Sequence, residues 1–295
     1  MYRKSIDLLQ RHICFWLPLI SVLLLTSVWP LLLTFFYSFT DAQIDNPSLW
    51  NFVGLKNFLF LVQDSNWWIA VKNNLIFTII SVSLETILGL SFALILNQYL
   101  PFKGVFRSIM ILPWAIPAVV GAKMWEWMFH DQNGIINEVL LSLGLISEKI
   151  AWMASSKTSL GAIIFADVWQ ATPFMTLMCL AALQTLPLEV FDAAKVDGAS
   201  AFQRFRNITL PLIKPALLVA ILFRSIDTLK IFDLPYVLGA NNSDTVMMSI
   251  YAREQLIDFQ DQGYGSAVAG GIFMVIALFV IIYMQVSQLK TFKGV

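Results

Sequence analysis

Charged side chains interrupt several apolar stretches of this sequence. Arg224, Asp227 and Lys230 recur at three-residue spacing, which places side chains on one face of a helix. Asp167 and Gln170 repeat this spacing in another apolar stretch. A charge at the centre of a membrane helix costs about 2.5–3.5 kcal/mol, so such residues need a partner or a polar cavity. Three interpretations stay open: an ion-pair ladder within the helix, a contact with a second membrane subunit, or the lining of a polar path.

No catalytic or metal-binding motif accompanies these charges. The sequence contains no G-x4-GK-[ST] pattern, no HExxH and no GxSxG. His12 and His130 lie in different segments, and Cys14 and Cys179 each stand in an apolar run without a CxxC or a histidine neighbour. Cysteines in such surroundings are typical of packing residues. We therefore expect no enzymatic activity, no metal site and no cofactor on this chain.

The composition requires a solvent other than water. Of the 295 residues 58% are hydrophobic and 13% charged, against about 45–50% apolar and about 25% charged in soluble domains. The mean hydropathy is +0.73. Lys plus Arg equals Asp plus Glu at 19 each, so no basic surface for nucleic acid is predicted.

Long apolar runs predict an all-α, polytopic membrane protein. A bilayer core about 30 Å thick needs roughly 20 apolar residues in a helix, and such runs are too long for barrel strands. The six expected spans are residues 14–36, 75–97, 105–129, 158–183, 212–234 and 266–288, within one membrane domain over 14–289.

Arg3, Lys4 and Arg11 precede the first run, as in a signal peptide. That run is longer than a signal peptide's and no A-x-A site follows, so an uncleaved helix is expected.

The distribution of Lys and Arg predicts the orientation, because cytoplasmic loops carry an excess of these residues. With the N-terminus inside, eleven of the 19 fall in inside segments and five in outside loops. Residues 1–13 and 290–295 are therefore expected in the cytoplasm, and so is the segment between spans four and five.

Prolines within the expected spans predict breaks or kinks, because proline removes a helical hydrogen bond. Pro113 and Pro117 lie in span three and Pro173 in span four. Pro211 and Pro215 lie at the start of span five.

The inside segment 186–211 is too long for a simple connector. Pro187 suits a first helical position, and Gly198 can end that helix in a left-handed conformation. Ser200 and Gln203 form a capping-box pattern for a second short helix. Two short helices joined at an angle are expected, with apolar side chains that need the bilayer surface or a partner protein. These side chains are Val190, Phe191, Phe202 and Phe205.

The same segment carries a resemblance to a protein family. The pattern EAA-x3-G-x9-I-x-LP is typical of the permease subunits of binding-protein-dependent ABC importers. The chain matches its spacing, with Asp in place of Glu at position 192. The matching residues are Asp192, Ala193, Ala194, Gly198, Ile208, Leu210 and Pro211.

The resemblance extends over most of the chain and is closest to the sugar-type subgroup, with its maltose- and trehalose-type permeases. The similar segments are 72–78, 106–129, 131–137, 214–233 and 263–267. The chain departs at Gly239-Ala240-Asn241, where many relatives have a Gly-Gly-Pro-like turn. No shape is therefore predicted for the outside loop 235–265.

The resemblance implies the permease fold of type I ABC importers, in the inner membrane of a bacterium. It implies four kinds of partner: a second, unlike permease, two ABC ATPase subunits, an extracytoplasmic solute-binding protein, and a sugar or sugar-like solute. ATP and Mg²⁺ would bind to the ATPases. Residues 187–203 would form the coupling helix that docks on an ATPase. The sequence does not specify whether the solute is an oligosaccharide, a glycoside, a glycosyl-polyol or glycerol phosphate.

The resemblance also favours a polar path for the intramembrane charges. Arg224 and Asp227 would lie on that path, with Asp167, Gln170 and Trp169 as the second group. Aromatic rings beside polar groups suit a sugar, and Trp125, Trp127 and Trp169 are available for stacking.

Two other classes of membrane protein compete with this interpretation. Half of an ion-coupled secondary transporter would need an essential buried carboxylate, for which Glu85 and Asp167 are the choices. A channel subunit without energised transport would need none. Neither class accounts for the segment 186–211.

Overall fold

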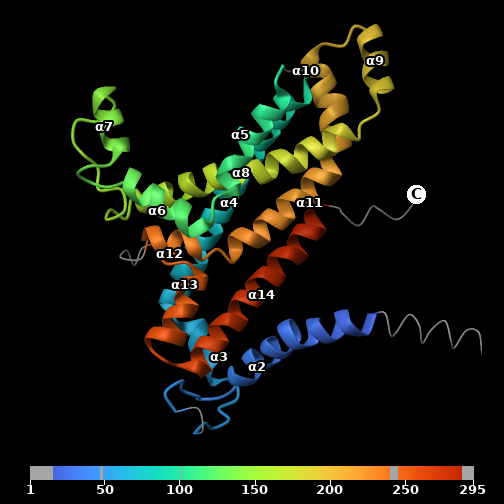
Figure 1. The fold of residues 1–295 in the computed structure, drawn as a ribbon. Helices are drawn as coiled ribbons and strands as arrows, with labels where there is room; N and C mark the ends of the chain where they lie inside the picture. Colours follow the sequence, from blue (N-terminus) through green and yellow to red (C-terminus); the bar gives the residue numbers. More distant parts are fainter. Residues whose placement is uncertain (1–15, 47–48, 100, 240–244, 288–295) are drawn as a thin grey trace, which may run out of the picture. The chain divides into compact units, whose positions relative to one another are not determined.

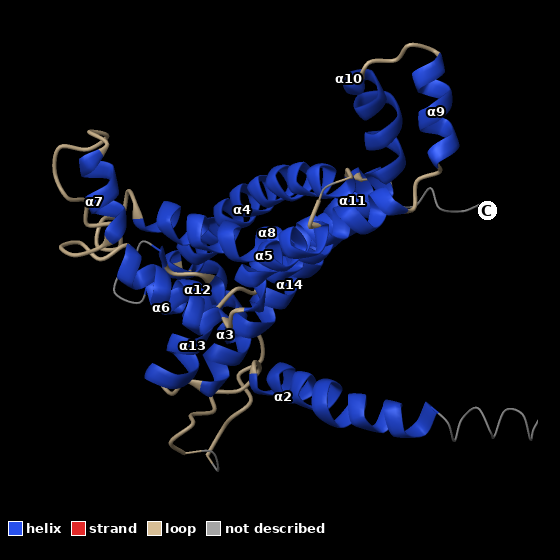
Figure 2. Ribbon diagram, turned by 45° about the horizontal axis from the view of Figure 1, so that its top comes forward, coloured by secondary structure: helices blue, strands red, loops and turns tan. Residues whose placement is uncertain are grey.

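The computed structural model describes residues 16–46, 49–99, 101–239 and 245–287. Their regular structure is helical apart from two isolated β-bridges, Thr40–Phe52 and Gln43–Asp261, and Figure 2 shows these residues as helices and loops only. The predicted all-α fold is thereby confirmed for this part of the chain. Predictions on the two terminal segments, Cys14, Ala240 and Asn241 lie outside the described residues.

The chain divides into two compact units, which are described separately. Unit 1 comprises Met1–Asp64 and Tyr251–Met274, and unit 2 comprises Ser65–Ile250 and Val275–Val295. The division falls within two helices, α13 (Met248–Arg253) and α14 (Gln262–Val286).

Unit 1 holds the first long helix, Trp16–Tyr37. Its regular elements are η1 (Leu24–Val28, a π-helical segment), α2 (Trp29–Tyr37), α3 (Lys56–Gln63), the end of α13, η4 (Glu254–Asp258) and the first part of α14. The carboxylate of Asp64 accepts hydrogen bonds from the hydroxyls of Tyr251 and Tyr264. Burial, followed by the bond to Asp64, raises the pKa of Tyr251 to about 12. This cluster joins the end of α3 to α13 and α14.

Unit 2 is a helical bundle built around α4 and α8. Its long helices are α4 (Ser65–Asn97), α5 (Lys103–Ala115), α6 (Ala118–Met128), α8 (Ser159–Gln184) and α11 (Leu210–Leu229). Its short elements are α7 (Ile135–Ser142), α9 (Leu188–Val196), α10 (Ala201–Arg204), η2 (Phe205–Thr209) and α12 (Asp233–Gly239). A Cβ added at Gly89 of α4 would lie 2.6 Å from the Cβ of Met175 in α8. Glycine therefore allows these two helices to approach closely.

The third expected span is broken at its second proline. α5 and α6 meet at an angle of 90°, and Ile116, the first of the two residues between them, has an extended ψ of 129°. The residue before a proline is pushed out of the helical region, so Pro117 accounts for the break. Pro113 is accommodated inside α5, and α8 continues as one helix through Pro173. The predicted break is confirmed at Pro117, whereas Pro173 does not interrupt its helix.

By length and composition five helices could each cross a membrane, or six if the bent pair α5–α6 is one span. Each of the six expected ranges overlaps one of these helices. Three ends differ: α4 begins at Ser65 rather than near residue 75, and the helix of the fifth span runs over Ala201–Leu229 rather than 212–234. The chain leaves the helical conformation at Lys230, and α12 begins at Asp233. A proline two residues into α12, Pro235, disfavours a helix that runs through from α11.

The loops of unit 2 separate to two ends of the bundle. The pair α9–α10 follows the end of α8 and precedes α11, whereas α6, α7 and α12 lie at the other ends of these helices (Figure 1). The 26 residues of α8 measure about 39 Å along the helix axis. The two ends are therefore separated by more than the thickness of a bilayer core.

Candidate functional site

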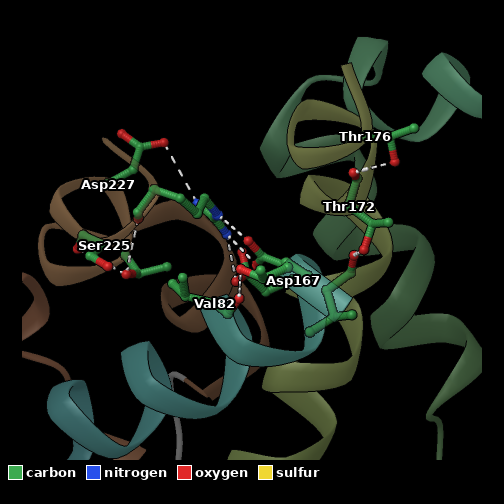
Figure 3. A network of polar contacts seen from close by, with 11 residues as sticks. Val82, Asp167, Thr172, Thr176, Ser225 and Asp227 are labelled. Carbon is green, nitrogen blue, oxygen red and sulfur yellow. Dashed lines mark hydrogen bonds and ion pairs between the residues drawn. The ribbon is translucent and has the colours of Figure 1, made fainter. Parts of the chain in front are cut away.

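An arginine in the middle of unit 2 joins three helices. Arg224 of α11 donates from Nε to Oε2 of Glu85 in α4 (2.7 Å) and from Nη2 to Oε1 of the same carboxylate (2.9 Å). The same Nη2 donates to Oδ2 of Asp167 in α8 (2.6 Å). Figure 3 shows Asp167 on the side of the guanidinium opposite Asp227. Three short bonds from one planar guanidinium fix the direction as well as the distance of the two carboxylates.

The charges change from buried to exposed along this network. The side chains of Glu85, Asp167 and Arg224 are 0%, 7% and 8% exposed, whereas that of Asp227 is 62% exposed. Nη1 of Arg224 lies 3.6 Å from Oδ2 of Asp227, and Nζ of Lys230 lies 3.5 Å from Oδ1. The expected ion-pair ladder along this stretch is therefore present, but its distances are longer than those between helices. The short bonds of Arg224 run to other helices, because the helix packs this face against α4 and α8.

The exposed end of the network opens into a hollow of about 550 Å³. Ligand sites for small molecules have volumes of about 300–1,000 Å³. Asp167, Gln170, Arg224 and Asp227, four of the residues predicted for a polar path, all line it. Trp114, Lys230 and Asp233 contribute further side chains to the lining.

Gln170 also holds the bend between α5 and α6. Its Nε2 donates to the carbonyl oxygen of Ile116 at 3.2 Å, at the break where helical hydrogen bonds are lost. A Cβ added to Gly121 of α6 would lie 3.4 Å from Oε1 of Gln170. The predicted polar residue therefore positions the wall of the hollow as well as lining it.

The predicted stacking tryptophans lie elsewhere. Trp125 is buried and packs edge-to-face against Trp169, with ring centroids 5.5 Å apart. Neither ring lines the hollow, and Trp127 points away from the core with 79% exposure. Trp169, which was grouped with Asp167 and Gln170 in the prediction, does not line this hollow. Adjacent residues on a helix face different directions, and the aromatic cluster takes up the face of Trp169. Trp114, which sequence analysis did not single out, supplies the aromatic ring instead.

A second missed residue is Asn74, which is fully buried in α4. Its Nδ2 donates to the carbonyl oxygen of Thr228 (2.9 Å), and its Oδ1 accepts from the backbone N–H of Met248 (3.1 Å). It therefore fixes the end of α11 beside Asp227. The polar Asn73-Asn74 pair within a long apolar helix was the indication available in the sequence.

The segment α9–α10 has the predicted turn and cap, but α10 is not a separate short helix, since it continues through η2 into α11 as one helix over Ala201–Leu229. Gly198 follows α9 with a φ of +76°, a conformation that favours glycine. Oγ of Ser200 accepts from the backbone N–H of Gln203 (3.3 Å), while Oε1 of Gln203 accepts from the backbone N–H of Ser200 (2.7 Å). The left-handed glycine and the capping box are thus confirmed. Pro187 differs slightly, since it precedes the helix as its N-cap and Leu188 is the first helical residue.

The motif residues divide between an exposed and a packed group. Asp192 is 69% exposed and pairs with Lys195 at 2.8 Å. Ala193, Gly198 and Pro211 are exposed, Ala194 is buried, and Ile208 and Leu210 are half-buried. The apolar side chains left open to solvent are Leu188, Val190, Val196 and Phe202, whereas Phe191 and Phe205 are half-buried. The exposed residues of α9 and α10 form a surface that no other described residue covers.

The sequence profile of the family described as "Binding-protein-dependent transport system inner membrane component" matches residues 85–291. The chain belongs to this family. The matched region of the chain begins at Glu85 and includes the ion-pair network, the hollow and the segment α9–α10.

Individual relatives give the same result over nearly the whole chain. The sequence is 41% identical to the "Trehalose/maltose transport system permease protein MalF" of Thermococcus litoralis, over 93% of this chain and 92% of the relative. It is 33% identical to the "Sulfoquinovosyl glycerol transport system permease protein SmoG" of Agrobacterium fabrum, over 92% and 89%. It is also 33% identical to the "Trehalose transport system permease protein SugA" of Mycobacterium tuberculosis, over 96% and 91%.

Solved structures bear on the fold alone. A chain of a bacterial alginate ABC transporter, in complex with its pentasaccharide-bound periplasmic protein, matches with a TM-score of 0.85 and 21% identity, over 99% of both chains. A chain of the MetNI methionine ABC transporter matches with a TM-score of 0.53, over 79% of this chain and 95% of that one. The predicted importer permease fold is thereby confirmed.

Proposed function

We propose that this chain is one of two unlike permease subunits of an ATP-driven importer. It would form half of the path for a sugar or sugar-like solute, which an extracytoplasmic binding protein delivers. Its relatives include permeases named for trehalose, for maltose and for a sulfoquinovosyl glycerol. The observation that carries the proposal is the surface of α9–α10, where exposed apolar side chains stand on the family's motif at one end of the bundle.

The motif segment would act as the coupling helix. Two ATPase subunits beneath the permeases would bind ATP and Mg²⁺ and close on them. A helix seated in an ATPase must then move with it, and a short rigid helix transmits that motion where a flexible loop would absorb it. The capping box and the turn at Gly198 give α9–α10 this rigidity. The bundle would respond as a two-state element, open to one side or to the other.

The hollow at the end of α11 would lie on the solute path. Asp167, Gln170 and Asp227 offer oxygen and amide groups to sugar hydroxyls, and Trp114 offers an aromatic face. Arg224, at the buried end of the network, would hold the side chain of Asp227 in place. This chain would perform no chemistry itself, so its role would be to bind, position and release the solute.

In the membrane of a bacterium, both termini of the chain would lie in the cytoplasm with α9–α10. The loops with α7 and α12 would then face outward, toward the binding protein. A cysteine at Ser142 should react with an impermeant thiol reagent in intact cells, whereas one at Ala199 should react only after permeabilisation. The reverse pattern would overturn the orientation.

Reconstitution tests the energy source. Vesicles that contain this chain, its partner permease and the ATPases should take up solute only with ATP inside and the binding protein outside. Uptake should persist with proton and sodium ionophores. Uptake that collapses with an ionophore and needs no ATP would indicate an ion-coupled transporter instead.

Gly198 offers a direct test of coupling. Gly198→Val should lower uptake, with ATP hydrolysis uncoupled or the ATPase released. Gly144→Val is a matched control, since Gly144 also has a positive φ of 68° and, like Gly198, has open space around it. Normal uptake by Gly198→Val, or an equal loss in both variants, would contradict a specific role for the coupling segment.

Asp227 offers the matching test for the path. Asp227→Asn should change the half-saturation or the maximal rate of uptake without affecting assembly of the complex. Asp131→Asn changes the same group outside the hollow and should leave both unchanged. Unaltered uptake by Asp227→Asn would remove this carboxylate from the path.

A further inference from the structure

The hollow at the end of α11 has an uneven charge distribution. Four carboxylates lie in it or directly behind it, and they belong to Glu85, Asp167, Asp227 and Asp233. Two cations accompany them, Arg224 and Lys230. The five charged groups that line the hollow itself, three carboxylates and two cations, carry one more negative than positive charge when all are ionised.

Both cations already contact carboxylates, Arg224 through short buried bonds and Lys230 through a longer, exposed contact. Nε and Nη2 of Arg224 are taken by Glu85 and Asp167, and its Nη1 faces Asp227. Nζ of Lys230 lies 3.5 Å from the carboxylate of Asp227. A carboxylate, sulfonate or phosphate that entered the hollow would have to displace a buried pair to reach Arg224, and to compete with Asp227 for Lys230. Displacing a buried partner is costly, because it leaves a charge uncompensated.

The carboxylates, by contrast, remain open on one side. Asp227 is 62% exposed, and Asp233 stands exposed in the first turn of α12. Each offers acceptor oxygens to the hydroxyl groups of a neutral solute.

We propose that this hollow selects against anions, so that the solute carried past it is an uncharged polyhydroxy compound rather than an acidic sugar or a sugar phosphate. This inference rests on the proposed function, because it assumes that the hollow lies on the solute path. Discrimination would come from repulsion of the anionic competitor as well as from hydrogen bonds to the neutral solute. Clefts lined by charge of one sign raise local counter-ion concentrations by factors of about 10–10³, and the mixed but net negative lining of this hollow should act at the lower end of that range.

Cysteine modification measures this field without knowledge of the solute. Ala115 lines the hollow and is exposed. Ala115→Cys would be introduced after replacement of the native cysteines by Cys14→Ser and Cys179→Ala. The assembled importer in membrane vesicles would then be treated with two methanethiosulfonates, one carrying a trimethylammonium group and one carrying a sulfonate. The ratio of the two rates reports the local potential, because the reactivity of the thiol cancels in it.

Ser142→Cys at the end of α7 serves as the reference, since its neighbouring charges Glu138 and Lys149 form a pair. Relative to this reference, the cationic reagent should be favoured at Ala115→Cys by about tenfold. The preference should disappear in concentrated salt, where the screening length falls to about 3 Å. Asp233→Asn should lower the ratio by about two- to threefold, since one charge is removed close to the probe. Asp131→Asn, outside the hollow, should leave the ratio unchanged.

The outcomes separate this inference from the proposed function. If Ala115→Cys reacts with both reagents at the reference ratio, or prefers the anionic one, charge selection is overturned while a water-filled path remains. If neither reagent reacts in any nucleotide state, the hollow is closed to solute, and the proposed path and the inference fall together. An equal drop in the ratio with Asp131→Asn would also overturn the inference, since the field would then not originate in the hollow.

Discussion

Two ion pairs of similar length show how differently one kind of contact is used in this chain. Arg224–Glu85 and Lys195–Asp192 both bring a cation and a carboxylate within 3 Å. The first pair is buried, doubly hydrogen-bonded and links helices far apart in sequence. The second is exposed, has a single short contact and links neighbours on one helix. The first arrangement fixes helices, whereas the second leaves α9 free to meet a partner.

The largest expected effect comes from breaking the buried pair. Arg224→Ala leaves two carboxylates in the bundle without a counter-charge, and loss of one partner of a buried pair costs about 3–5 kcal/mol. We expect a strongly reduced thermal transition of the purified permease complex, or a failure to assemble. Lys195→Ala should change stability by less than about 1 kcal/mol, as is usual for exposed pairs.

Arg224→Lys sharpens the comparison. Lysine retains the charge but lacks the planar set of donors with which the guanidinium bonds two carboxylates. The stability of the Arg224→Lys protein should therefore fall between those of the native protein and Arg224→Ala. Equal stability of the arginine and lysine proteins would show that charge alone, and not geometry, holds the three helices.

Two glycines allow the same comparison between a tightly packed position and an open one. Gly89→Ala places a Cβ 2.6 Å from that of Met175 and 3.0 Å from the backbone of α8. Overpacking of this kind costs about 1–3 kcal/mol. Gly161→Ala, within α8 but in open space, should instead stabilise the helix by up to about 1 kcal/mol. Denaturation of the two variants in parallel measures the difference, and a stable Gly89→Ala protein would show that α4 and α8 can separate.

A smaller effect is expected in the coupling segment. Ser200→Ala removes one half of the capping box and should cost about 1 kcal/mol locally. Because α10 is the first turn of the continuous helix Ala201–Leu229, faster amide exchange at residues 201–204 should report the change better than global unfolding does. Ser142→Ala is the control, because it makes the same change at the C-terminal end of α7, where the side chain caps no helix N-terminus. Unchanged exchange in Ser200→Ala would mean that packing, and not the cap, orders α10.

The sequence predicted the coupling segment better than the solute path, for a physical reason. A left-handed glycine and a capping box are local, since the interacting groups lie within three residues of each other. The partners of Arg224 lie 57 and 139 residues away, and no local pattern reports which helices meet. The three-residue spacing of Arg224, Asp227 and Lys230 therefore indicated the ladder along the helix, but not the shorter bonds from Arg224 to α4 and α8.

The break at Pro117 was predicted from local stereochemistry, but its consequence was not. The Gln170 side chain supports the broken backbone from another helix, and this contact requires the packed bundle. Trp169, one residue away, faces the aromatic cluster instead. Which face of α8 meets the hollow depends on the packing of α4, α5 and α11 around it.

The smallest effect on stability, and the sharpest test of the contrast, lies on the open surface of α9. Val196 is 88% exposed, so Val196→Ser should change the free energy of unfolding by no more than about 0.5 kcal/mol. If α9 docks on an ATPase, the same change should still weaken co-purification of that subunit, because an apolar contact is lost at the interface. Leu145→Ser, which changes another exposed apolar residue (67%) in the loop after α7, should affect neither property. A Val196→Ser permease that retains its ATPase in full would show that this side chain is not part of the docking surface.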